Sequence, residues 1–423
     1  MTKHEALQKY FGYTSFRPAQ EELIDALTEG RDVLGVMPTG AGKSICYQIP
    51  ALMLSGVTLV ISPLISLMKD QVAQLKQGNV PAAFINSSLT AEQYREVLRR
   101  VGEGRYKIIY VAPERLENAD FLRFASETPI SLVAVDEAHC VSQWGQDFRP
   151  SYLRIIRFIE KLRERPVIGA FTATATADVK KDIARLLDLR DPLSITTGFD
   201  RPNLYFGIAK PKNKTRYFYE LIAQRDGMCG IVYCATRKTV DSICAGLRRR
   251  GISASRYHAG LDDVERRLNQ EDFIHNRITV MVATNAFGMG IDKPDVRYVF
   301  HYNMPKNLES YYQEAGRAGR DGKPSDCILL YAQDDIRTAE FLIRDAGKNE
   351  ELTEKESNTV RHRDAARLDK IIRYCEIDGC LRSYILRYFG EKQKGDCGNC
   401  SNCNRPGLFQ RRKKHVFRKN EIL

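Results

Sequence analysis

The chain has 423 residues, which is too long for one hydrophobic core and predicts two or three domains. A hydrophobic content of 43% suffices for globular folding, and the formal net charge of +12 favours a polyanionic partner. No apolar run approaches the ~20 residues that span a bilayer, and the N-terminal sequence MTKHEALQKYF lacks the apolar centre of a signal peptide. We therefore expect no membrane association and a cytoplasmic location. In a bacterium the protein would be associated with the nucleoid, and in a eukaryote it would lie in the nucleus.

The sequence MPTGAGKS at residues 37–44 predicts a phosphate-binding loop, because it follows the apolar run Val33–Val36 and precedes a predicted helix. Its glycines allow backbone N–H groups to point at phosphate oxygens, and the helix N-terminus adds partial positive charge. Lys43 would reach the β- and γ-phosphates, and Ser44 would ligate Mg²⁺. Met37 replaces the first glycine of the usual pattern. The residues expected to bind the nucleotide here are Thr39, Gly40, Gly42, Lys43 and Ser44.

A second motif, DEAH at residues 136–139, follows the predicted buried strand 132–135. Carboxylates at the carboxyl end of such a strand face the crevice where open α/β sheets bind ligands. Asp136 would hold Mg²⁺ through its water shell, Glu137 would orient or deprotonate the attacking water, and His139 belongs to the same catalytic group. A solvated acidic turn is the alternative, but the phosphate-binding loop upstream favours catalysis.

Short runs rich in Val, Ile and Leu alternate with helical patterns, which predicts parallel sheets covered on both faces. The expected strands of a first α/β domain are 33–36, 58–62, 82–86, 107–111, 132–135 and 167–171. Those of a second α/β domain are 204–208, 230–234, 253–257, 279–283, 296–301 and 327–331. The stretch 191–203 between them carries Pro and Gly and is the expected hinge. Because the second half contains no phosphate-binding loop, one nucleotide site would be shared by two domains that close around the ligand.

The pattern changes near residue 340. Residues 337–344 predict a helix, residues 348–357 are charged and poorly periodic, and residues 363–389 have helical spacing. A cysteine group follows, and the basic stretch 411–419 predicts a disordered, solvated tail that could still touch phosphates.

Eleven cysteines in a reducing compartment argue against a disulfide framework and favour a metal site. Cys397, Cys400 and Cys403 form two overlapping C-x-x-C steps, which leave a tetrahedral Zn²⁺ one ligand short. Cys375 and Cys380 are the upstream candidates for the fourth ligand. If both lie on one helix, they sit about 140° apart and cannot easily both face the metal. An iron–sulfur cluster and unrelated buried thiols are the alternatives.

Seven motifs taken together resemble those of RecQ-type DNA helicases. They are FGY at 11–13, FRPAQ at 16–20, MPTGAGKS at 37–44, DEAH at 136–139, SQWGQDFRP at 142–150, TATA at 172–175 and QEAGRAGRDG at 313–322. The resemblance implies an α/β fold of two tandem RecA-like parallel-sheet domains followed by a small helical zinc-binding module. It also implies an ATP- and Mg²⁺-dependent enzyme that translocates 3′→5′ on single-stranded DNA and unwinds duplex DNA, in DNA repair and recombination.

From this resemblance we expect helicase domains at 1–199 and 200–343, a zinc-binding module at 344–405 and a basic tail at 406–423. RecQ relatives commonly continue into winged-helix and further helical (HRDC) domains, so we expect this chain to be a short form or a fragment. We also expect it to be a monomer. An RNA helicase or ATP-driven remodeller is the alternative within the same class. A nucleic-acid-binding scaffold with an idle ATPase is the alternative from another class.

The resemblance assigns adenine recognition to three residues near the N-terminus. Tyr13 and Arg17 would sandwich the base, and Gln20 would offer it a donor and an acceptor. Alternatively, the aromatic residues Phe11, Tyr13 and Phe16 only pack an N-terminal helix.

The resemblance also assigns Gln313, Arg317 and Arg320 to catalysis. Arg317 and Arg320 lie one helical turn apart and are expected to project from one face as arginine fingers. A solvated basic face is the alternative. The fourth zinc ligand selected by the resemblance is Cys380.

The segment 142–150 would couple DNA binding to ATP hydrolysis through Trp144, Phe148 and Arg149. A buried Trp144 that anchors the loop is the alternative. Gln146 stands where relatives often have His, which bears on the tuning of this coupling. Loops at 172–174 and 284–292 are expected to link the nucleotide to the second domain and to nucleic acid.

Overall fold

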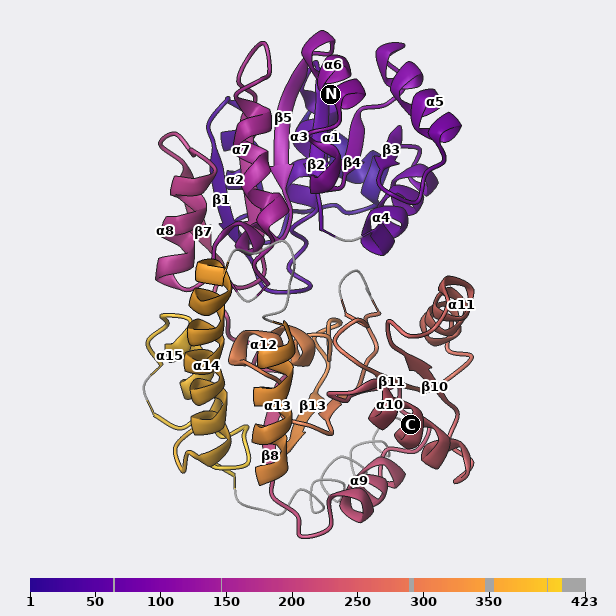
Figure 1. Cartoon of the computed structure of the whole chain (residues 1–423), viewed down its shortest axis with the longest axis vertical. Coiled ribbons are helices and arrows are strands. Elements are labelled where there is room, and N and C mark those ends of the chain that lie inside the picture. Colours follow the sequence, from indigo (N-terminus) through magenta and orange to yellow (C-terminus); the bar gives the residue numbers. More distant parts are fainter. Residues whose placement is uncertain (64, 146, 289–292, 347–353, 394, 405–423) are drawn as a thin grey trace, which may run out of the picture. The chain divides into compact units, whose positions relative to one another are not determined.

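The computed structural model describes residues 1–404 except 64, 146, 289–292, 347–353 and 394, and it divides into two compact units between Phe199 and Asp200 (Figure 1). Each unit contains one parallel sheet, and the second unit also carries two further helices and a cysteine loop. This arrangement confirms the predicted α/β fold class, in which two RecA-like domains precede a helical zinc-binding region.

The first unit contains a seven-stranded parallel sheet. Its strands are β1 (Val33–Val36), β2 (Val57–Ile61), β3 (Ala82–Ile85), β4 (Ile108–Val111), β5 (Ile130–Val135), β6 (Val167–Thr172) and β7 (Leu193–Thr196), in the spatial order β3-β4-β2-β5-β6-β1-β7. Every residue of β1, β2 and β4 is buried. Strands covered on both faces are apolar throughout, which explains why continuous apolar runs located them in the sequence.

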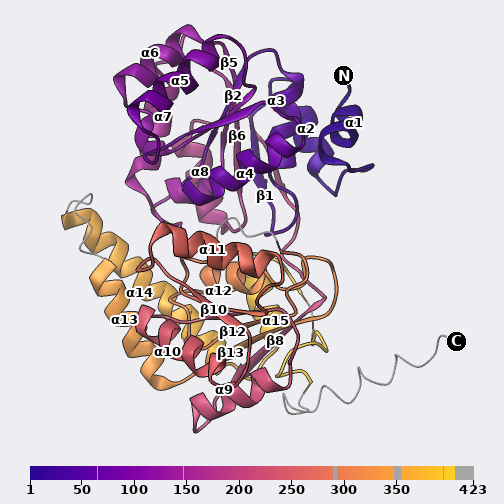
Figure 2. The same ribbon diagram turned by 90° about the vertical axis from the view of Figure 1, so that its right-hand side faces the viewer.

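Helices cover both faces of this sheet, with α5 and α6 on one side and α2 and α3 on the other (Figure 2). The helices are α1 (Lys3–Ala6), α2 (Gln20–Thr28), α3 (Ile45–Met53), α4 (Ile65–Gln77), α5 (Ala91–Gly102), α6 (Ala119–Glu127), α7 (Arg154–Ile159) and α8 (Ala177–Leu186). Capping residues set several helix starts. Thr90, for example, forms a capping box with Gln93 at the start of α5.

Strand β7 lies within the stretch 191–203, so the prediction of a hinge there is wrong for residues 193–196. β7 pairs in parallel with β1 at the edge of the sheet. Leu193 and Ile195 alternate with the exposed Ser194 and Thr196. Such a short edge strand gives a weak sequence signal. The nearby proline and glycine therefore led to the prediction of a hinge.

The second unit contains a six-stranded parallel sheet. Its strands are β8 (Leu204–Ala209), β9 (Gly230–Tyr233), β10 (Ala254–Tyr257), β11 (Val280–Ala283), β12 (Tyr298–His301) and β13 (Ser325–Leu330), in the spatial order β10-β11-β9-β12-β13-β8. The helices associated with it are α9 (Lys214–Ala223), α10 (Arg237–Arg248), α11 (Asp263–Ile274), α12 (Leu308–Ala315) and α13 (Gln333–Ala346). All predicted strands of this unit occur within two residues of their expected bounds.

Two helices, α14 (Glu354–Glu376) and α15 (Leu381–Tyr388), follow the second sheet. The sequence pattern merged them into one helical stretch. Cys375 lies on α14, whereas Cys380 is the residue that caps the start of α15. The two cysteines therefore do not share one helix. The predicted angle of about 140° between them, which assumed a shared helix, does not apply.

The expected basic tail 406–423, Gln146 and residues 289–292 of the expected nucleic-acid loop lie outside the described residues. Within the described ranges, no helix combines the length and apolar character needed to cross a membrane.

Candidate active site and metal centre

Three neighbouring strands of the first unit bring the predicted catalytic motifs to one edge of the sheet. β1, β6 and β5 are adjacent and parallel, so their carboxyl ends share that edge. The phosphate-binding loop follows β1, Thr172 ends β6, and Asp136 follows β5. The Met37 N–H donates a hydrogen bond to the Thr172 carbonyl over 2.9 Å, which joins the loop to the end of β6. The sheet topology thus gathers residues that are far apart in the sequence.

The phosphate-binding loop depends on two glycines with left-handed backbone. Gly40 and Gly42 have φ angles of 87° and 81°, a region that side chains rarely adopt. A Cβ atom on Gly42 would also collide with the side-chain amide of Gln20. Ser44 directly precedes α3, so the loop and the helix N-terminus form one continuous anion-binding element.

Arg17 and Gln20 hold the phosphate-binding loop. The Gln20 amide donates to the Gly42 carbonyl over 2.9 Å and accepts from the Arg17 backbone N–H over 2.8 Å. The Arg17 guanidinium donates to the Gly40 carbonyl. Both residues therefore stand beside the loop, where the resemblance places adenine recognition, and the structure gives them an additional role in shaping the loop.

The N-terminal aromatic residues divide into two groups. Phe11 and Phe16 pack against a small buried cluster formed by Ala6, Leu7, Ile24, Ile45 and Ile49. The Tyr13 side chain is 54% exposed. The packing alternative therefore applies to the two phenylalanines, and Tyr13 remains accessible to a base.

Asp136 and Glu137 are buried at the end of β5, which excludes a solvated acidic turn. The Glu137 N–H donates to Asp136 Oδ1, and the Tyr152 hydroxyl donates to the Asp136 carbonyl, each over 3.0 Å. Burial, and then repulsion by Glu137, raises the pKa of Asp136 to about 6, while Lys43 opposes the shift. A divalent cation would stabilise the charged carboxylate, so this donor set fits Mg²⁺. No sequence motif pointed to Tyr152.

His139 connects the DEAH motif to β6. Its Nδ1 atom lies 2.8 Å from Thr172 Oγ1 and 3.3 Å from Glu137 Oε2. The Thr172 hydroxyl donates its single hydrogen to the Thr174 carbonyl over 3.1 Å. With the hydroxyl hydrogen directed at Thr174, His139 Nδ1 is the group that can donate to Thr172 Oγ1. This network joins Glu137 to the TATA segment through His139 and Thr172. The predicted link from Thr172 and Thr174 to the second domain stays a prediction.

Trp144 lies in a loop built tightly onto the DEAH segment. Its side chain is 54% exposed, which excludes the alternative of a buried anchor. The Trp144 N–H donates to the Ser142 hydroxyl over 3.0 Å, and the Gly145 N–H donates to the Ser142 carbonyl over 2.8 Å. A Cβ atom on Gly145 would collide with the His139 carbonyl, so this approach requires glycine.

Arg149 braces the same loop. Its guanidinium donates to the Pro63 carbonyl over 2.9 Å and to the Asp147 carboxylate over 3.0 and 3.1 Å. Its backbone N–H donates to the Cys140 carbonyl over 3.0 Å. Phe148 beside it is partly buried. Within this loop, Trp144 is thus the aromatic side chain most accessible to a base, and Arg149 supports its loop.

Arg317 and Arg320 lie in a turn of the second unit and not on a helix, because α12 ends at Ala315. The prediction of a shared helical face is therefore wrong. Arg317 is 5% exposed, so it is no solvated basic residue. Its guanidinium would lie 2.9 Å from a Cβ atom on Gly288, so glycine there makes room for it. Gln313 lies within α12 and is partly buried.

The cysteine cluster has the geometry of a tetrahedral metal site. The four sulfur atoms that lie within 4.8 Å of one another belong to Cys380, Cys397, Cys400 and Cys403. In a Zn(Cys)₄ tetrahedron with Zn–S bonds of about 2.3 Å, neighbouring sulfurs are about 3.8 Å apart. Burial alone would raise the pKa of Cys380, but hydrogen bonds from Ser383 and Cys397 hold it at about 6, which favours the metal-binding thiolate. Cys375 is buried elsewhere, so the fourth member is Cys380, as the resemblance implied.

Two asparagines anchor the cysteine loop. The Asn402 side chain donates to the Gly379 carbonyl over 2.8 Å, beside Cys380. The Asn399 side chain donates to the Leu204 carbonyl over 3.1 Å, at the start of β8. Side-chain contacts to distant backbone leave no local pattern, so the sequence analysis did not find this anchoring.

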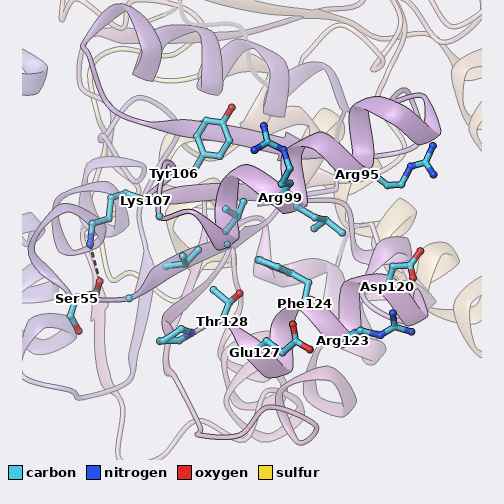
Figure 3. Close-up of a pocket in the computed structure, with 17 residues that line it drawn as sticks. Ser55, Arg95, Arg99, Tyr106, Lys107, Asp120, Arg123, Phe124, Glu127 and Thr128 are labelled. Atoms are coloured by element: carbon cyan, nitrogen blue, oxygen red, sulfur yellow. Dashed lines mark hydrogen bonds between the residues drawn. The ribbon is translucent and has the colours of Figure 1, made fainter.

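A separate cavity of about 820 Å³ lies beside α5 and α6 (Figure 3). Its lining includes Val57, which starts β2, Lys107, which precedes β4, and Pro129, which precedes β5. The Lys107 ammonium donates to the Ser55 carbonyl over 2.9 Å. These positions mark the amino ends of the strands, opposite to the edge that carries the catalytic motifs. The cavity is therefore distinct from the candidate active site.

Three family models match successive segments of the chain. They are the DEAD/DEAH box helicase over residues 17–183, the helicase conserved C-terminal domain over 213–322 and the RecQ zinc-binding family over 333–404. These ranges correspond in order to the first sheet, the second sheet and the region of the cysteine cluster.

Curated relatives match nearly the whole chain. ATP-dependent DNA helicase RecQ of Bacillus subtilis is 48% identical over 94% of this chain, and the chain spans 66% of its length. The probable ATP-dependent DNA helicase RecS of the same organism is 38% identical, over 95% of this chain and 92% of its own length. Mss116p bound to single-stranded RNA and AMP-PNP has a TM-score of 0.68 at 16% identity, over 92% of this chain and 89% of its own, which is a likeness of fold.

The match to RecS extends over nearly the whole of both chains, and the zinc-binding match ends on the residues that form the cysteine cluster. Together with two helicase segments in the same order as the two sheets, these findings show that the chain belongs to the RecQ family of helicases.

Proposed function

We propose that this chain is an ATP-dependent DNA helicase that translocates 3′→5′ on single-stranded DNA and unwinds duplexes, in DNA repair and recombination. The observation that carries the proposal is that a phosphate-binding loop after β1 and the buried Asp136 and Glu137 after β5 lie on the same edge of the sheet. The names of RecQ and RecS, both DNA helicases, favour DNA over RNA. The direction of translocation and the repair role rest on family resemblance.

In the proposed mechanism, the first unit (1–199) binds ATP. Lys43 would contact the β- and γ-phosphates, and Ser44 and Asp136 would hold Mg²⁺, which would neutralise charge on the phosphates. Glu137 orients and deprotonates the attacking water. His139, fixed by Thr172, keeps the Glu137 carboxylate in place. Tyr13, Arg17 and Gln20 recognise the adenine.

The second unit, which we divide into a helicase domain at 200–343 and a zinc-binding module at 344–405, contributes positive charge. Arg317 and Arg320 would stabilise the charge that develops on the γ-phosphate during hydrolysis, and Gln313 acts beside them. The Cys₄ cluster would hold Zn²⁺ in a closed site, which serves structure and not catalysis.

One experiment separates the proposed function from its alternatives. We would measure ATP hydrolysis by the purified chain with single-stranded DNA, with single-stranded RNA and without polymer. Strong stimulation by DNA supports the DNA helicase, stimulation by RNA favours an RNA helicase or remodeller, and no hydrolysis under any condition favours a scaffold.

Trp144→Ala is expected to leave hydrolysis without DNA unchanged and to blunt its stimulation by single-stranded DNA. Loss of one stacking partner, worth about 1–3 kcal/mol, should raise the DNA concentration for half-maximal stimulation roughly tenfold or more. Arg149→Ala should act in the same direction, because the loop loses its brace. Titration of hydrolysis against DNA concentration measures both effects.

Two further variants control this experiment. Trp144→Phe keeps an aromatic ring and should retain most of the stimulation. Phe341→Ala removes an aromatic side chain that is 63% exposed on α13, and it should change nothing. Full stimulation in both Trp144→Ala and Arg149→Ala would show that the loop has only a structural role.

Elemental analysis is expected to find one zinc per chain, and Cys400→Ser should yield poorly soluble, zinc-depleted protein. A closed Cys₄ site contributes about 10–16 kcal/mol of apparent binding free energy to folding, so its loss is large. Cys375→Ala, at a buried thiol outside the cluster, is the matched control and should keep its zinc. A soluble and active Cys400→Ser protein without zinc would contradict the structural role.

A further inference from the structure

The turn that carries Arg317 and Arg320 begins where α12 ends, and hydrogen bonds from residues far away in the sequence add to its own backbone bonds. One side chain alone makes hydrogen bonds to three carbonyl groups of its backbone. The Arg201 guanidinium donates three hydrogen bonds to this turn, over 3.2, 3.0 and 3.0 Å, to the carbonyl oxygens of Gly316, Ala318 and Gly319. These carbonyls flank Arg317 and directly precede Arg320.

A second side chain from the same segment grips the end of the turn. The Asn203 amide donates to the Gly319 carbonyl over 2.9 Å and to the Lys323 carbonyl over 3.0 Å. Gly319 has a φ of 55°, and a Cβ atom there would lie 2.5 Å from the Asn203 amide nitrogen. The glycine therefore permits both the bend of the chain and the close approach of Asn203.

The zinc-binding module in turn holds the segment 200–204. Arg382, which is 4% exposed on α15, donates to the Asp200 carboxylate over 2.7 Å and to the Arg201 carbonyl over 2.6 Å. Asn399 of the cysteine loop donates to the Pro202 carbonyl over 3.0 Å. Hydrogen bonds thus run without a break from the cysteine loop, through this segment, to the turn 316–319.

We propose that Arg201 is a positioning residue for ATP hydrolysis: it fixes the turn that presents Arg317 and Arg320, and the zinc-binding module fixes Arg201. This inference rests on the proposed function, in which those two arginines stabilise charge on the γ-phosphate. Misplacing a catalytic group by about 1 Å can cost about 10²-fold in rate. The planar guanidinium spreads its donors over a rigid fork that reaches three separate carbonyls, whereas a lysine ammonium carries its three donors on one nitrogen at the end of a flexible chain.

The test compares the intact chain with Arg201→Lys, which keeps the charge. We would measure kcat and KM for ATP with saturating single-stranded DNA, and the affinities for ADP and for ADP with aluminium fluoride. We expect kcat to fall by about 10- to 100-fold, with KM and ADP affinity changed by less than about twofold. Aluminium fluoride bound with ADP mimics the transferred phosphoryl group. The unaltered chain should bind ADP with aluminium fluoride more tightly than ADP alone, and Arg201→Lys should lose this difference. Partial unfolding would lower the number of binding sites and leave the ratio of these two affinities unchanged.

A double-mutant cycle tests whether Arg201 acts through the turn. Arg201→Lys should lower kcat by a smaller factor in the Arg320→Gln background than in the unaltered chain, since Arg320→Gln already removes one of the two arginines that Arg201 positions. Arg225→Lys is the matched control, because Arg225 is a buried arginine of the same unit that pairs with Asp326 away from the turn. Its kcat should equal that of the unaltered chain.

Asn203→Ala is a second variant that leaves Arg201 in place, should Arg201→Lys fail to fold. It should lower kcat with the same unchanged KM, by a smaller factor. An unaltered kcat in Arg201→Lys, or additive effects in the cycle, would overturn the inference about Arg201. The proposed function would still be supported in that case, provided that the unaltered chain shows DNA-stimulated ATPase activity. If the unaltered chain shows no DNA-stimulated ATPase activity, the proposed function and the inference about Arg201 both fail. The measurement on the unaltered chain therefore distinguishes the two failures.

Discussion

Lys43→Ala is expected to abolish ATP hydrolysis and leave the protein folded. Lys43 lies on a partly exposed loop between β1 and α3, so its truncation leaves the buried core intact. It removes the one side-chain cation of the phosphate-binding loop, and losing a single such electrostatic contact costs at least about 10²–10³-fold in kcat. Steady-state hydrolysis with saturating single-stranded DNA measures the loss, and thermal unfolding followed by circular dichroism checks the fold.

Lys76→Ala is the matched control, because Lys76 is an exposed lysine on α4 that is not part of the predicted site. It should hydrolyse ATP at the normal rate. Near-normal turnover in Lys43→Ala would remove the central claim about this loop. A lowered unfolding temperature in Lys43→Ala alone would instead show that the lysine supports the loop structure.

Glu137→Gln should bind ATP with normal affinity and hydrolyse it about 10²–10⁴-fold more slowly, because the attacking water loses its base. The amide has nearly the same shape as the carboxylate, so it can occupy the same buried position beside His139. A fluorescent ATP analogue measures the affinity, and single-turnover hydrolysis measures the chemical step separately from product release.

The control for this substitution is Glu376→Gln, at a carboxylate that accepts a hydrogen bond from the Tyr331 hydroxyl in the second unit. A glutamine oxygen can accept the same bond, so neither binding nor hydrolysis should change. Lost ATP binding in Glu137→Gln would mean that this carboxylate serves the nucleotide or the metal and not the water.

The sequence predicted the first unit in detail because buried parallel strands are continuously apolar and their ends carry the motifs. The runs at 33–36 and 132–135 located β1 and β5, and the polar residues that follow them located the site. That β6 lies between these strands, and that Thr172 therefore meets His139, followed only from the sheet order. Local periodicity carries no information about which strands are neighbours.

The second unit shows where spacing misleads. Arg317 and Arg320 have the spacing of one helical turn, yet α12 ends before them. The N–H groups of Arg317 and Ala318 bond to carbonyls three residues back, and carbonyls of the turn accept hydrogen bonds from Arg201. A contact across more than a hundred residues leaves no periodic signal. For the same reason, the sequence left the fourth cysteine ligand open between Cys375 and Cys380, and only the family resemblance selected between them.

Trp144 is the single tryptophan among 423 residues, and its ring is largely in water on the loop beside the DEAH segment. The natural indole fluorescence of the chain therefore comes from one point. Emission excited selectively from indole reports on that loop without any label, and a base that stacks on the ring would quench it directly. Because the ring is already hydrated in the folded state, this signal is a poor measure of unfolding, for which the tyrosines of both units are better suited.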